Sequence, residues 1–152
     1  MNEQVNYLIK RLKRKLSRNV VHLKPLKENG RNVLISYSTF AFIAPPELSN
    51  KHTNIWECQQ IAQTFLDLGY SVDVIDWTDT KFVPHKNYAY FIDPHQNISR
   101  LRPLLNQDCN IIMYIATSHW LFQNHAEYER LLSIKARRGS CLTPRRWLPP
   151  LQ

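Results

Sequence analysis

Polar and aromatic side chains gather in four short stretches of this sequence, and each stretch follows an apolar run. The first stretch contains His52, Thr53, Asn54 and Trp56. The other three supply carboxylate, imidazole, hydroxyl, amide and indole groups: Asp76, Trp77, Thr78, Asp79, Asp93, His95, Thr117, Ser118, His119, Trp120, Asn124 and His125. Such groups around a cleft suit a carbohydrate or another polyhydroxylated ligand, because they combine hydrogen bonding with flat apolar faces. The alternative for each aromatic residue is a place in the hydrophobic core.

The apolar runs that precede these stretches predict buried β-strands, because they are short and rich in β-branched or aromatic residues. They are "NVLISYS" (32–38), "SVDVIDW" (71–77), "NYAYFID" (87–93) and "NIIMYIA" (110–116). Helical periodicity begins at Asn54, and "ISRLRPLL" predicts a short helix that Pro103 kinks or delays. The segment "AEYERLLSIKARRG" (126–139) predicts a further helix that ends at Gly139.

The order of these elements predicts an α/β fold with a Rossmann-like, doubly wound and mostly parallel sheet. Right-handed crossovers place the loops after the strands along the carboxyl edge of such a sheet, where ligands bind. These loops are residues 38–54, 77–82, 93–97 and 116–125. We therefore expect the four polar stretches to converge on one ligand-binding edge.

Several familiar motifs are missing from the sequence. It has only three glycines, none of them in the loop after the first predicted strand, and it lacks G-x-G-x-x-G, P-loop, G-x-S-x-G and H-E-x-x-H patterns. NAD binding of the usual kind and nucleotide hydrolysis are therefore disfavoured. Cys58, Cys109 and Cys141 lie far apart and show no metal-ligand spacing, so neither a structural metal nor a cofactor is expected.

The net charge of +8 comes from the two ends of the chain. Residues 1–31 hold nine Lys and Arg against two Glu, and residues 135–152 hold five and no acid. Residues 32–134 carry six basic and ten acidic side chains. We expect a basic amphipathic helix and linker over 1–31, a Rossmann-like domain over 32–139, and an irregular basic, proline-containing tail over 140–152.

Residues 5–18 predict the basic amphipathic helix, since their apolar side chains recur at helical spacing: Val5, Leu8, Ile9, Leu12 and Leu16. Such a helix can lie on an anionic membrane surface, or its apolar stripe can pack on the domain. Nucleic-acid binding is the least favoured reading, because no aromatic residues are interleaved with these charges as a stacking platform requires. The N-terminus has no signal-peptide pattern, and no apolar run is long enough to span a membrane. The expected location is cytoplasmic, at the inner face of the membrane if the helix binds lipid.

Three segments together resemble the beginning of a bacterial glycosyltransferase of the GT-B type, from the group-one, family-four-like retaining enzymes. They are "IWECQQIAQTFLDLGYSVDVIDW" (55–77), "YAYFID" (88–93) and "IIMYIATSHWLFQNHAEYERLLSIKARRG" (111–139). In that family two Rossmann-like domains face each other across a cleft. The resemblance implies that this chain corresponds to the N-terminal, acceptor-side domain, whereas the C-terminal domain of the family binds the nucleotide-sugar donor.

The resemblance also implies roles for individual residues. His52, Thr53 and Asn54 occupy the loop after the first strand, which in the family lies beside the acceptor and the donor phosphates. His119 matches a histidine that lines the donor-sugar pocket, and Trp120 follows it. The family's donor domain carries two glutamates eight positions apart, and this chain has no such pair. The resemblance identifies no catalytic residue here.

These observations leave three functional hypotheses. The first is the acceptor-side half of a transferase that uses a UDP- or GDP-sugar, inactive alone because the donor-binding domain is missing. The second is a non-catalytic α/β interaction or regulatory protein that pairs with a separate subunit. The third, a nucleic-acid binder that uses the basic ends, is opposed by the acidic middle of the chain.

Overall fold

The computed structural model describes residues 20–45, 52–94, 97–115, 118–145 and 147–148. The chain divides into two compact units, Met1–Tyr114 and Ile115–Gln152. The amphipathic helix predicted over 5–18 lies outside the described residues. The Rossmann-like domain expected over 32–139 runs across the boundary between the two units.

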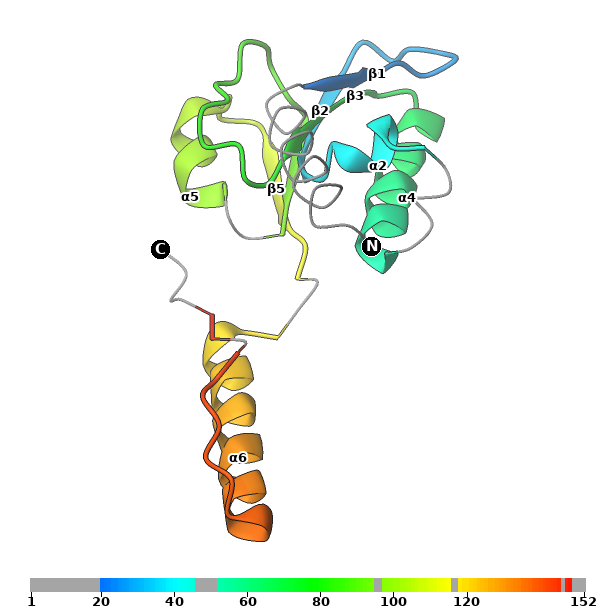
Figure 1. Cartoon of the computed structure of the whole chain (residues 1–152). Coiled ribbons are helices and arrows are strands. Elements are labelled where there is room, and N and C mark those ends of the chain that lie inside the picture. The colour runs from blue at the N-terminus through cyan, green and yellow to red at the C-terminus, as the bar shows by residue number, and fades with distance from the viewer. Residues whose placement is uncertain (1–19, 46–51, 95–96, 116–117, 146, 149–152) are drawn as a thin grey trace. The chain divides into compact units, whose positions relative to one another are not determined.

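The first unit contains a five-stranded mixed sheet with the strand order β1-β3-β2-β4-β5 (Figure 1). The parallel strands are β2 (Asn32–Tyr37), β3 (Ser71–Asp76), β4 (Tyr90–Asp93) and β5 (Asn110–Met113). Each of the four lies inside a run that the sequence predicts to be a strand. An α/β fold with a mostly parallel sheet is therefore confirmed.

The fifth strand, β1 (Val21–Leu23), lies in the segment 19–31 that the sequence predicts to be a linker. It pairs antiparallel with β3, with Val21 opposite Val74 and Leu23 opposite Val72. Three residues are too few to show strand periodicity, so the sequence carried no signal for it. The linker prediction is wrong at these positions.

Both faces of the sheet are covered by apolar side chains, because parallel strands alternate buried residues between two layers. One core cluster holds Val33, Ile35, Val72 and Val74 under α4 (Thr53–Asp67). The opposite cluster is built by Leu34, Ile75, Phe82, Tyr88, Phe91 and Leu101. Helix α4 starts within one residue of its predicted start at Asn54, and Gly69 reverses the chain after it with a φ of 86°.

Two shorter helices follow the ends of strands. Helix α2 (Phe40–Ile43) follows β2, and α5 (Ile98–Leu101) follows β4 and continues into the 3-10 turn η1 (Arg102–Leu104). Pro103 lies inside this turn, which agrees with the short, proline-affected helix predicted for the segment. Figure 1 shows α4 and α5 on opposite sides of the sheet.

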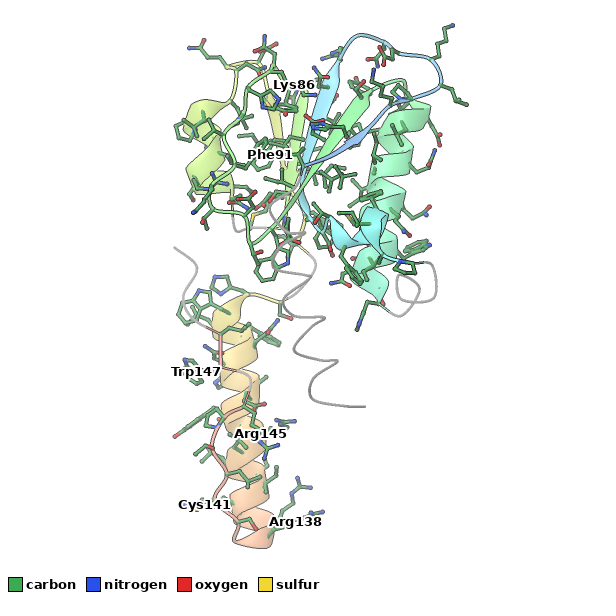
Figure 2. All side chains as sticks on the ribbon, turned by 45° about the horizontal axis from the view of Figure 1, so that its top comes forward. Lys86, Phe91, Arg138, Cys141, Arg145 and Trp147 are labelled. Atoms are coloured by element: carbon green, nitrogen blue, oxygen red, sulfur yellow. The ribbon has the colours of Figure 1, made fainter. Side chains whose placement is uncertain are left out.

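The second unit consists of α6 (Trp120–Arg138) and the segment that returns beside it. The helix begins at Trp120 rather than at the predicted residue 126, and it ends at Gly139 as expected. Asn124 pairs with Leu148 through two hydrogen bonds of 2.8 and 2.9 Å, which fix the returning segment against the helix. Figure 2 shows Cys141, Arg145 and Trp147 along this segment. Among the described helices, none is long and apolar enough to cross a bilayer.

Candidate functional site

The carboxyl ends of β2 and β4 lie next to each other, although these strands are not consecutive in the chain. From β2 the chain passes to β3 on one side, and from β3 it returns to β4 on the other side of β2. In open parallel sheets, ligands bind outside the carboxyl ends of strands at a point where successive connections leave in opposite directions. The ends of β2 and β4 are therefore the candidate functional site.

A buried polar network occupies this position. The side-chain amide of Asn97 donates to the Ser36 hydroxyl and to the Trp77 carbonyl, each at 3.0 Å. The backbone N–H of Asn97 donates to the Asp93 carboxylate at 3.1 Å. Because Ser36, Trp77 and Asp93 lie at the carboxyl ends of three different strands, Asn97 ties these ends together. No motif in the sequence singles out Asn97 for this role.

Arg100 fixes this network from α5. Its guanidinium donates to the Asn97 side-chain oxygen at 2.9 and 3.0 Å, and to the carbonyls of Phe82 and Asp79 at 2.6 and 2.9 Å. These contacts hold the loop after β3 against α5. Since its donors already serve this loop, Arg100 has a structural role at this edge.

A second group of hydroxyls lies at the end of β2. The Tyr37 hydroxyl donates to the Glu57 carboxylate on α4 at 3.0 Å, and the ring of Tyr114 lies 6.0 Å from the ring of Tyr37. Burial and then the Glu57 carboxylate raise the pKa of both tyrosines above the ordinary value of 10.0. Both phenols therefore stay protonated at neutral pH, and they can donate hydrogen bonds.

The carboxylates after β3 shape their own loop. Asp76 accepts hydrogen bonds from the backbone and hydroxyl of Thr78, at 3.1 and 2.6 Å. Asp79 accepts from the backbone N–H groups of Lys81 and Phe82. These are Asx-type turns, in which the side chain replaces a backbone acceptor. The indole of Trp77 is 42% exposed beside them.

His52, Thr53 and Asn54 lie at the start of α4, on the carboxyl side of β2, and all three are exposed. His52 is the N-cap residue, and its carbonyl accepts from the N–H groups of Ile55 and Trp56. No side-chain hydrogen bond caps this end of the helix. First-turn N–H groups of a helix this long attract anions and hydroxyl oxygens.

His119 and Trp120 belong to the second unit. His119 is the N-cap of α6, where its Nδ1 accepts from the Leu121 N–H at 3.3 Å. Its ring lies 5.6 Å from that of Trp120. In this unit both residues define the start of α6.

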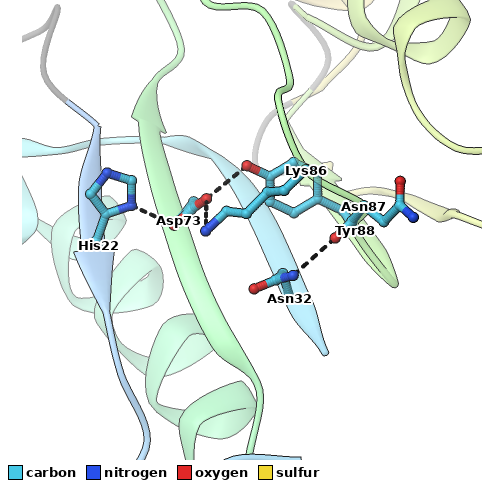
Figure 3. Close-up of polar contacts among 6 residues, drawn as sticks. All are labelled: His22, Asn32, Asp73, Lys86, Asn87 and Tyr88. Carbon is cyan, nitrogen blue, oxygen red and sulfur yellow. Dashed lines mark hydrogen bonds and ion pairs between the residues drawn. The ribbon is translucent and has the colours of Figure 1, made fainter. Parts of the chain in front are cut away.

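A separate polar cluster surrounds Asp73 in the middle of β3 (Figure 3). Its carboxylate is almost fully buried and binds three partners: His22 Nδ1 at 2.7 Å, Lys86 Nζ at 2.8 Å and the Tyr88 hydroxyl at 2.7 Å. Burial by itself would raise the pKa of Asp73, but the hydrogen bonds from Lys86, Tyr88 and His22 outweigh it and lower the pKa below 3.8. The cluster satisfies a buried charge, so we assign it a structural role.

Within the described residues, no group of three or more His, Cys, Asp or Glu side chains could hold a metal ion. The carboxyl edge instead offers protonated phenols, amides, a hydroxyl and carboxylates. Comparison with models of protein families, with curated proteins and with solved structures found no match to this chain.

Proposed function

We propose that the first unit is the acceptor-side, Rossmann-like half of a nucleotide-sugar-dependent glycosyltransferase. One observation carries the proposal: the network of Ser36, Asp93 and Asn97 lies where β2 and β4 end side by side. Doubly wound sheets bind their ligands at this place. The sequence resemblance to GT-B enzymes supplies the reaction class.

The chemistry beside this network suits a sugar acceptor. A sugar hydroxyl both donates and accepts hydrogen bonds, so it needs an acceptor and a donor on the protein. Glu57 provides a carboxylate acceptor, and the Tyr37 hydroxyl, whose proton is donated to Glu57, keeps an oxygen that can accept from the sugar. The exposed side-chain amide of Asn54 supplies N–H donors. The exposed indole of Trp77 adds an apolar face of the kind that packs against a sugar ring.

The donor side must come from a second domain. A departing nucleoside diphosphate needs positive charge or helix N-termini directed at its phosphates. Arg100 already donates to Asn97 and to two backbone carbonyls, which leaves it poorly suited to bind phosphate. The isolated chain is therefore expected to bind acceptor sugars and to be inactive with UDP- or GDP-sugars. In this proposal residues 5–18 dock the domain on an anionic membrane, where lipid-linked acceptors lie.

The test is a titration of the isotope-labelled chain with a panel of methyl glycosides, followed by NMR. Chemical-shift changes on addition of a bound glycoside should cluster at Tyr37, Glu57 and Asn97. Removing one hydroxyl with Tyr37→Phe should weaken binding by about fivefold, the value of one hydrogen bond. Tyr70→Phe is the matched control, because the Tyr70 hydroxyl accepts from Arg31 elsewhere in the unit. Shifts that avoid the carboxyl edge, or the absence of binding by every glycoside, would contradict the proposal.

A second candidate function is a non-catalytic interaction protein that pairs with a separate subunit. The second unit favours it, because α6 exposes an apolar stripe at helical spacing: Leu121 at 56%, Tyr128 at 54% and Leu132 at 43%. Under this alternative Leu132→Glu should remove a stoichiometric subunit that co-purifies with the native chain, while glycosides should not bind. Retention of that subunit by the variant would count against it.

A further inference from the structure

The outer side of β5 is an open sheet edge within the described part of the chain. The backbone N–H of Asn110 donates to Ala89, and that of Tyr114 donates to Asp93. Backbone groups alternate in direction along a strand, so Ile111 and Met113 direct their N–H and C=O groups away from β4. These groups can pair with a further strand.

The side chains of β5 do not protect this edge. Natural sheets block exposed edges with charged residues or proline, but the strand "NIIM" contains neither. Ile112 is 41% exposed and Met113 is 52% exposed, on opposite faces of the sheet. Apolar side chains at an unpaired edge favour association with another strand.

A groove of about 700 Å³ lies beside the edge, on the face that carries α5. Its lining includes Leu105, Cys109, Ile111 and Met113, with Arg102 at its side. An added strand would therefore find backbone partners along β5 and a groove, lined by both apolar and polar residues, for a side chain on that face.

We propose that this edge pairs with β5 of a second copy of the chain, in an antiparallel arrangement around a two-fold axis. Residues that face outward must pair with each other, so Ile111 of one copy would exchange hydrogen bonds with Met113 of the other. Ile112 then lies opposite Ile112 of the second copy at the axis. The two sheets would join into one continuous sheet.

The strand is compatible with pairing to itself. It contains no charged side chain, so the two-fold arrangement places no like charges opposite each other. A symmetric dimer uses the same surface on both copies, and Ile111 and Met113 complement each other across the axis. Met113 of the second copy lies on the groove face, where a flexible thioether chain can fill the irregular space beside Leu105 and Cys109.

The test is sedimentation equilibrium of the full chain at rising protein concentration, and the mass should approach twice the 18.0 kDa of one chain. Ile112→Lys and Ile112→Glu should each stay at the mass of one chain, because each places like charges at the axis. An equimolar mixture of the two variants should recover the doubled mass, since Lys then faces Glu. Leu68→Lys, at an exposed position after α4, is the control and should behave as the wild type.

The equimolar mixture of the two variants tests both the surface that makes the contact and the register in which the two β5 strands pair. A wild-type chain that keeps the mass of one copy at every concentration would overturn the proposal. So would variants that dimerise singly, which would place the contact elsewhere, or a mixture that stays monomeric, which would remove Ile112 from the axis. Far-UV circular dichroism of each variant shows that the fold is retained. The proposal does not depend on the glycosyltransferase function, because it concerns a different edge of the sheet.

Discussion

The two edge strands of the sheet, β1 and β5, are held in different ways. β1 has only three residues, but His22 in its middle binds the buried carboxylate of Asp73 on the neighbouring strand. β5 has four residues, and it pairs with β4 through backbone hydrogen bonds. β1 also leaves little apolar surface uncovered, whereas Ile112 and Met113 of β5 are about half exposed.

This difference shows how a sheet can close one edge and leave the other available. A buried carboxylate must be satisfied, so Asp73 fixes the strand that carries His22 and the loop that carries Lys86 and Tyr88. Among the described residues, no buried carboxylate anchors β5 in this way. We therefore expect substitutions near β1 to change the free energy of unfolding, and substitutions on β5 to change association.

The largest effect is expected from Asp73→Asn. The variant keeps the size of the side chain, but Lys86 loses its ion-pair partner and the amide cannot accept from three donors. Unfolding by urea should show a loss of about 3 kcal/mol, the lower end for one partner of a buried pair, because Lys86 is partly exposed. Asp67→Asn is the control on an exposed helix face and should change stability by less than about 0.5 kcal/mol. Equal effects of the two substitutions would show that the cluster does not anchor β1.

A smaller loss is expected from Gly69→Ala, which acts on the turn between β1 and β2. Gly69 has a φ of 86°, and an added Cβ would lie 2.9 Å from the Lys27 carbonyl oxygen. Gly30→Ala is the matched control, since its φ is also positive but its Cβ would meet nothing within 4 Å. Both variants should lose about 1 kcal/mol to backbone strain, and Gly69→Ala about 1 kcal/mol more to the clash. Equal urea midpoints for the two variants would mean that the backbone around Lys27 accommodates the added Cβ without a further loss of stability.

The third prediction concerns how the stability contribution of Asp73 changes as the pH falls. The pKa of Asp73 is lower in the folded protein than its ordinary value of 3.8, since hydrogen bonds outweigh the effect of burial. The stabilisation is therefore complete above 3.8 and is lost as the pH falls through the folded pKa. The stability difference between the wild type and Asp73→Asn should be constant at higher pH and shrink below 3.8. Asp108, whose pKa is also lowered, is present in both proteins and cancels. A difference that persists unchanged into strong acid would assign the stabilisation to another group.

The contrast between the edges also explains what the sequence could predict. The strands β2 and β3 were predictable because both of their faces are buried, which leaves unbroken apolar runs in the sequence. β1 was not predictable, because it is held by a hydrogen bond between His22 and Asp73, which lie 51 residues apart in the sequence. Contacts of such separation leave no local pattern.

The residues of the candidate site also divide into those that the sequence could place and those that required the structure. Topology alone placed His52, Thr53 and Asn54 on the carboxyl side of β2, since a loop after a parallel strand lies there. The Asn97 network and the pair Tyr37–Glu57 needed the folded chain, because their members come from different elements. α6 was predicted to start late because its N-cap is His119, a residue type that does not stand out as a cap in sequence.

The smallest and most local prediction uses two cysteines to compare the interior of the sheet with its open edge. Cys58 is a fully buried residue of α4, and burial raises the pKa of its thiol to about 12. Cys109 lies just before β5, is only partly buried, and has a pKa raised by burial and by Asp108. Since the thiolate is the reactive form, iodoacetamide should modify exposed Cys141 first, Cys109 next and Cys58 last, as followed by mass spectrometry.

The dependence on protein concentration then sharpens the comparison. If two copies pair through β5, Met113 of the second copy covers the groove that Cys109 lines, so the rate at Cys109 should fall as the chain becomes concentrated. Cys141 lies in the other unit and supplies an internal control whose rate should not change. The Ile112→Lys variant should keep a constant rate at Cys109. A rate at Cys109 that follows Cys141 at every concentration would show that the edge stays open, and modification of Cys58 as fast as Cys109 would show that the covered face opens as readily as the edge.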